Sequence, residues 1–143
     1  MLGDKLETVI AACEFIRNQF AETQPPGACL NHALALRWAL NQKGTYSRVI
    51  TGEAFWQVGS SPHDTIVFCR SEQGAGGFHA WVEVDTPNGS VNIDPTCYTL
   101  AKYATQEGIA MTWRAPMALI WAAGSILTPV ERVEPGAWSY MTS

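Results

Sequence analysis

The period of the hydrophobic residues changes at Gly44, and this change constrains the fold more than any other feature. Before Gly44, apolar residues recur at helical spacing, which predicts helices over residues 4–21 and 28–43. After it, apolar and polar residues alternate in short runs that Gly, Pro, Ser and Asn clusters separate. These runs predict strands over residues 46–58, 65–69, 78–85 and 90–94, with a short helix over 99–106. Helices followed by antiparallel strands predict an α+β fold, in which the helices pack on one side of an antiparallel sheet.

The second predicted helix carries apolar residues around most of its circumference. These residues are Leu30, Ala33, Leu34, Leu36, Trp38 and Leu40. A helix that is apolar on nearly all sides is usually buried on all sides. We therefore expect residues 28–43 to form a central, buried helix.

The size and charge of the chain limit its class. Its 143 residues fit one domain spanning residues 1–143, which can bury a core without a disulfide or a metal ion. The net charge of −4 and the isoelectric point of about 5.2 argue against nucleic acid as a partner. The same charge mildly favours neutral or basic ligands. The sequence does not indicate an oligomeric state.

The cellular compartment is inferred from two patterns. The first residues lack a basic segment followed by a long apolar run, and no apolar stretch is long enough to span a membrane. The four cysteines, Cys13, Cys29, Cys69 and Cys97, are widely scattered. Without secretion such thiols stay reduced, so we expect a cytoplasmic protein with no membrane association.

Cys29 is the candidate nucleophile. It stands at the start of the second predicted helix, where unpaired backbone N–H groups and the helix dipole favour a thiolate over a thiol. A cysteine at such a position can equally be a small buried hydrophobe. The position of Cys29 alone does not decide between these two interpretations.

His79 and Asp94 are the candidate partners of Cys29. Alternation assigns Ala80 and Val82 to a core face, and assigns His79 and Trp81 to a polar face that lines a groove or meets solvent. Asp94 ends the next predicted strand, from which a carboxylate can accept the far N–H of an imidazole. The alternatives are a histidine on an exposed strand face and an aspartate that forms a turn before a proline. Trp81 is also a candidate groove wall, because it shares the face of His79.

Four segments carry a resemblance to a known family. They are Gly27-Ala-Cys-Leu-Asn-His-Ala33, Val49-Ile-Thr-Gly52, His79-Ala-Trp-Val-Glu-Val84 and Asp94-Pro-Thr96. Together they resemble the transglutaminase-like branch of the papain-type cysteine protease superfamily. The resemblance covers roughly residues 26–96 and implies the papain/transglutaminase-like fold.

The resemblance implies a separate catalytic role for each residue of the site. Cys29 is the nucleophile that forms a thioester, His79 is the base, and Asp94 orients His79. Papain-type relatives add a glutamine before the cysteine that binds the oxyanion, and Gln24 is the candidate here.

The function expected from this pattern is a thiol-dependent hydrolase of the peptidase or amidase type, acting on a peptide or small amide. Acyl transfer to an amine and a non-catalytic binding domain of the same fold are the alternatives. No cofactor and no metal ion are expected. A zinc site made by Cys29, His32, His79 and Asp94 is a weaker alternative, because the sequence lacks a close cysteine pair.

The proposed pairing of His79 and Asp94 depends on the register of two strands. A two-residue turn at Asn88-Gly89 would place Glu83, and not His79, opposite Asp94. We therefore predict a wider loop, of about four or more residues around Asp85–Asn88. We also predict an imidazole–carboxylate contact of about 2.6–3.2 Å.

Overall fold

The computed structural model describes residues 2–21, 28–68, 78–112, 114–115, 117–122 and 137–142. The helices are η1 (Gly3–Lys5), α1 (Leu6–Phe20), α2 (Cys29–Gln42), η2 (Cys97–Thr99) and α3 (Leu100–Gln106). The strands are β1 (Ser47–Gln57), β2 (Thr65–Phe68), β3 (His79–Thr86), β4 (Gly89–Asp94), β5 (Leu119–Ala122) and β6 (Ala137–Thr142). The predicted helices and strands up to residue 106 are thus confirmed to within about two residues at each end. Beyond Gly108 the sequence pattern does not distinguish strands from a helix, and the structure places strands β5 and β6 there.

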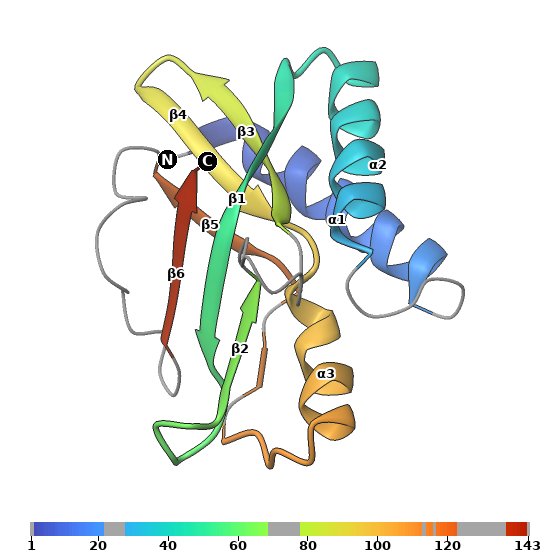
Figure 1. Cartoon of the computed structure of the whole chain (residues 1–143). Coiled ribbons are helices and arrows are strands. Elements are labelled where there is room, and N and C mark those ends of the chain that lie inside the picture. The colour runs from blue at the N-terminus through green and yellow to red at the C-terminus, as the bar shows by residue number, and fades with distance from the viewer. Residues whose placement is uncertain are drawn as a thin grey trace.

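The strands form one curled antiparallel sheet (Figure 1). Its order is β2-β1-β3-β4-β5, and β6 pairs with β1. The curl brings β5 and β6 close together, although no strand pairing between them is found among the described residues. Their proximity is shown by the rings of Trp121 on β5 and Tyr140 on β6, whose centroids lie 4.3 Å apart. The predicted α+β class, with helices packed on an antiparallel sheet, is confirmed.

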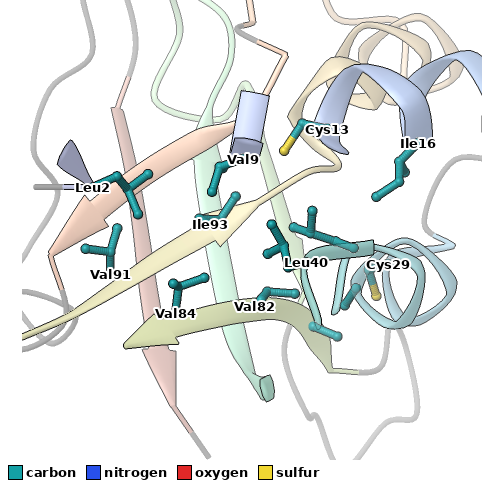
Figure 2. Packing of buried hydrophobic residues seen from close by; sticks show 13 residues of the cluster. Leu2, Val9, Cys13, Ile16, Cys29, Leu40, Val82, Val84, Val91 and Ile93 are labelled. Carbon is teal, nitrogen blue, oxygen red and sulfur yellow. The ribbon is translucent and has the colours of Figure 1, made fainter. Parts of the chain in front are cut away.

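Helices α1 and α2 lie side by side along one face of the sheet (Figure 1). Between them and the sheet lies the first hydrophobic cluster, which we call the helix-side core (Figure 2). Its buried members are Leu2, Val9, Cys13, Ile16, Cys29, Ala33, Leu36, Leu40, Ala80, Val82, Val84, Val91 and Ile93. Within the described ranges, no helix is long and apolar enough to cross a membrane.

Helix α2 is buried on one side only, so the prediction of a fully buried central helix is wrong. Leu36 and Leu40 are inaccessible to solvent, whereas Leu30, Leu34 and Trp38 are 40%, 46% and 64% exposed. The sheet and α1 cover one face of α2, and its other apolar residues remain at the surface. Periodicity could not reveal this, because folded proteins leave many apolar side chains exposed.

The other face of β3 is buried at His79 and Trp81, which corrects a second prediction, whereas Glu83 and Asp85 on the same face are half-buried and exposed, as expected. His79 and Trp81 are 1% and 0% exposed, although we expected this face to line a groove or meet solvent. They lie against the second cluster, which we call the inner core. Its buried members are Ala54, Trp56, Val58, Ile66, Trp81, Cys97, Leu100, Leu119, Trp121 and Tyr140. The curl of the sheet closes this cluster, and a curl leaves no mark on the alternation within one strand.

The hairpin between β3 and β4 is tighter than predicted. Thr86 pairs with Gly89, so the turn contains only Pro87 and Asn88, and the predicted loop of four or more residues is wrong. Proline at position 87 fits this turn, because it lies outside the ladder and has no N–H to donate. Gly89 adopts a φ of +119°, a conformation that glycine tolerates and other residues rarely adopt.

Candidate active site

Cys29 is the first residue of α2, with its side chain mostly buried and 8% exposed. Its Sγ lies 3.8 Å from the carbonyl oxygen of Phe78, the residue immediately before β3. Helix α2 therefore presents its positive end at the thiol, as the sequence predicted. Gln24, the predicted oxyanion residue, lies outside the described residues.

His79 and Asp94 are in direct contact. His79 Nε2 lies 2.7 Å from Asp94 Oδ2, and both side chains are buried. The predicted contact distance is confirmed, but its geometry differs from the expected one. Val82 pairs with Ile93, and continuing this register places Asp94 across from Trp81, so that His79 is a diagonal neighbour. Diagonal neighbours on one face of a sheet are within reach of long side chains, so no wider loop is needed.

Cys29 and His79 shift each other's pKa in opposite directions. Burial raises the pKa of the Cys29 thiol, but the nearby imidazole of His79 and its charge outweigh this effect, so the pKa is lowered overall. Burial lowers the pKa of His79, but the charge and hydrogen bond of Asp94, together with Cys29, raise it to about 9. Because Nε2 contacts Asp94, Nδ1 is the ring nitrogen that could exchange a proton with the thiol. Both shifts favour a thiolate–imidazolium pair.

Asp94 is buried but held ionised by several donors. Its Oδ1 accepts hydrogen bonds from the backbone N–H of Thr96 at 2.9 Å and from the Thr96 hydroxyl at 2.6 Å. Its Oδ2 accepts one from the Tyr140 hydroxyl in addition to the contact with His79. Burial raises the pKa of Asp94, but the charge of His79 and these hydrogen bonds bring it below its usual value. A carboxylate held in this way keeps the imidazole in one orientation.

Tyr140 is the residue of this site that sequence reasoning missed. It lies on β6 opposite Ala54 and is buried, and its hydroxyl accepts a hydrogen bond of 3.1 Å from Trp56 Nε1. Burial raises the pKa of Tyr140 well above its usual value, so the phenol remains a donor to Asp94. No local motif marks Tyr140, because 46 positions separate it from Asp94 and only the pairing of β6 with β1 brings them together.

Trp81 belongs to the inner core and does not line a groove, so the substrate-contact role considered for it is wrong. Its Nε1 donates to Asn92 Oδ1 at 2.9 Å, and its ring stacks on that of His79 with the centroids 6.0 Å apart. Trp56 meets the same imidazole edge-on at 5.1 Å. The two indoles therefore hold the imidazole plane in place.

His32 is engaged in contacts that differ from those of a metal ligand. Its Nδ1 lies 2.7 Å from the carbonyl oxygen of Ala28, and its Nε2 lies 2.6 Å from the hydroxyl of Tyr98. In the part of the chain that the structure describes, no group of three or more His, Cys, Asp or Glu side chains could hold a metal ion. His32 instead ties the first turn of α2 to η2.

The other described cysteines differ from Cys29 in their surroundings. Cys13 and Cys97 are buried free thiols. Burial raises the pKa of Cys13 to about 12 and that of Cys97 well above its usual value. Neither thiol is therefore prepared for nucleophilic attack. Cys69 lies outside the described residues.

Comparisons with known proteins support the fold but give no function. No protein-family model matches the chain, and no curated protein matches it. A solved structure titled "The crystal structure of genomics APC5867" is similar, with a TM-score of 0.59 and 14% sequence identity. The match covers 96% of this chain and 65% of that one, so this chain spans about two thirds of its neighbour's length. At this identity the likeness shows the fold alone.

Proposed function

We propose that the chain is a thiol-dependent hydrolase of the peptidase or amidase type, with a papain/transglutaminase-like arrangement of its site. The observation that carries the proposal is the 2.7 Å contact between His79 and Asp94, beside a Cys29 whose thiol pKa is lowered by His79. The pKa of the Cys29 thiol is lowered, and the pKa of the His79 imidazole is raised. This is the electrostatic state that a nucleophilic cysteine requires at neutral pH.

Acylation uses the thiolate and the imidazolium together. Cys29 Sγ attacks the carbonyl carbon of the amide, and a C–S bond forms while the carbonyl oxygen becomes an oxyanion. The backbone N–H of Cys29, in the first turn of α2, is the donor we assign to this oxyanion. When the intermediate collapses, the C–N bond breaks and the leaving amine takes the proton from His79 Nδ1.

Deacylation returns the site to its starting state. Neutral His79 takes a proton from water, and the resulting hydroxide attacks the thioester. The C–S bond breaks, the carboxylic acid leaves and the Cys29 thiolate is restored beside the imidazolium. Throughout, Asp94 holds Nε2–H and so keeps Nδ1 directed at the thiol.

Localisation in the cytoplasm is part of the same proposal. The mechanism requires Cys29 to be a free thiol, and a reducing compartment maintains such thiols. In the structure, Cys13, Cys29 and Cys97 are all free. Cell fractionation tests this point, and recovery of the protein in a secreted fraction would contradict it.

The decisive experiment measures the products of turnover. A library of short peptide amides is incubated with the protein, with and without an added primary amine, and the products are identified by mass spectrometry. The proposal expects carboxylic acid products that disappear in Cys29→Ser and persist in Cys13→Ser, a matched change at a buried thiol of raised pKa. Products formed only with the amine would indicate an acyltransferase. If Cys29→Ser keeps full activity, the proposal is overturned. If the unmodified protein binds the peptide amides but does not turn them over, it is a non-catalytic domain.

A further inference from the structure

A cavity of about 880 Å³ lies where α1, η2, α3 and the segment before β5 meet. The residues that matter for its chemistry are Arg17, Tyr98, Ala101, Met111, Arg114 and Met117. Its size lies within the range of small-molecule sites, about 300–1,000 Å³. The proposed function does not use this cavity.

Among the described residues, the charged side chains that line the cavity are two arginines, Arg17 from the end of α1 and Arg114 from the segment before β5. No Asp or Glu of the described ranges lines it, although the chain as a whole carries a net charge of −4. Among the described residues, neither guanidinium has an ion pair or a hydrogen bond. Arg48 differs, because its guanidinium lies 3.1 Å from the Asp85 carboxylate. Two positive charges without an acidic partner among the described residues thus share one hollow on an acidic protein.

We propose that this cavity binds a carboxylate-bearing ligand through Arg17 and Arg114. A guanidinium presents a planar set of donors that matches a carboxylate in a bidentate arrangement, and no described carboxylate pairs with either arginine in this way. Met111 and Met117 supply apolar surface for the carbon chain of the ligand. The net negative charge of the whole chain favoured neutral or basic ligands, but the positive charge of the cavity favours acidic ligands.

The cavity is connected to the beginning of α2. Tyr98 lines the cavity, and its hydroxyl lies 2.6 Å from His32 Nε2. His32 Nδ1 in turn lies 2.7 Å from the carbonyl oxygen of Ala28, the residue before Cys29. A ligand that contacts Tyr98 is therefore two side-chain contacts away from the start of the helix that bears the nucleophile. The carboxylate site itself does not depend on the proposed function. The further step, that the bound carboxylate is part of the substrate, rests on the proposed function.

Calorimetry on the full chain with Cys29→Ser tests the site without turnover. The probes are N-acetyl-Glu-Glu, glutarate and the neutral N-acetyl-Gln-Gln. We expect the acidic probes to bind at least about tenfold more tightly than the neutral dipeptide, and to bind more weakly as salt is added. Arg17→Gln and Arg114→Gln should each weaken binding about fivefold or more. Arg37→Gln, the same charge change on the exposed side of α2, should leave binding unchanged.

Each outcome decides a separate point. Tighter binding of N-acetyl-Glu-Glu than of glutarate assigns the site to acidic peptides, and equal binding assigns it to small free dicarboxylates. Equal binding of the neutral probe overturns the proposal, as does unchanged binding in both arginine variants. Because Arg114 is exposed, Arg114→Gln keeps the test valid if Arg17→Gln fails to fold. Charge-dependent binding without any hydrolysis by the unmodified protein would refute the proposed function and leave the site standing.

Discussion

The hydroxyl of Tyr140 donates a hydrogen bond to Oδ2 of Asp94 at 2.5 Å, and both side chains are buried. The same carboxylate oxygen also contacts His79 Nε2. The C-terminal strand β6 therefore contributes directly to the orientation of the imidazole. Tyr140 is 1% exposed and does not reach a substrate, so we regard it as a positioning residue.

Tyr140→Phe tests this relationship. The change keeps the ring and removes the donor, leaving Asp94 with one hydrogen bond fewer in a buried site. We expect kcat to fall about tenfold with KM unchanged, and the free energy of unfolding to fall by about 1–3 kcal/mol. Steady-state kinetics and urea unfolding measure the two effects. Tyr46→Phe, at a 62% exposed tyrosine, is the control and should change neither. A rise in KM alone would show that Tyr140 acts on binding instead.

Thiol reactivity distinguishes Cys29 from the other described cysteines. Its pKa is lowered, whereas burial raises the pKa of Cys13 to about 12 and that of Cys97 well above its usual value. Iodoacetamide at neutral pH should therefore modify Cys29 at least about tenfold faster than Cys13 or Cys97. Peptide mapping by mass spectrometry measures the order of modification. If Cys97 is modified first, the assignment of the nucleophile is wrong.

The pH dependence of turnover follows from the two coupled groups. Acylation requires a deprotonated Cys29 and a protonated His79. As pH rises, kcat/KM should increase through the lowered pKa of Cys29 and decrease again above about 9, the pKa of His79. The profile is measured with a single amide substrate in buffers of constant ionic strength. Activity that keeps rising well beyond pH 9 would exclude His79 as the proton donor.

Asp94→Asn removes the charge that maintains the protonated imidazole. Burial, the largest opposing effect, then lowers the pKa of His79, and less thiolate is present at neutral pH. We expect kcat to fall by about two to four orders of magnitude and alkylation of Cys29 to slow about tenfold or more. Asp85→Asn, at an exposed carboxylate paired with Arg48, is the matched control. An Asp94→Asn protein with normal alkylation kinetics would contradict the role of Asp94.

The one-sided burial of α2 gives a prediction for stability. Leu36 is inaccessible to solvent in the helix-side core, whereas Leu34 is exposed. Leu36→Ala should lower the free energy of unfolding by about 2–5 kcal/mol because it opens a cavity in this core. Leu34→Ala should change it by no more than about 0.5 kcal/mol. Urea denaturation of the two variants makes the comparison, and equal losses would mean that α2 is covered on both sides.

Local patterns were sufficient for the parts of the protein that depend on neighbours in sequence. The change of period at Gly44 predicted two helices followed by antiparallel strands. The position of Cys29 at a helix start follows from the proline and glycine residues before it. His79 and Asp94 could be named because His79 begins one alternating strand and Asp94 ends the next, and each is the first residue of a recognisable motif. These features depend on dihedral preferences and side-chain periodicity, which act over a few residues.

Only the tertiary structure decided what covers those elements. Alternation placed His79 and Trp81 on the same face of β3, but it could not show that β5 and β6 curl over this face and bury it. The register of β3 and β4 made Asp94 a diagonal neighbour of His79, which the motif alone did not specify. Tyr140 reaches Asp94 through the pairing of β6 with β1. Strand pairing and sheet curl join residues that are distant in sequence, and their energies depend on which surfaces are buried together, so a single strand carries no local record of them.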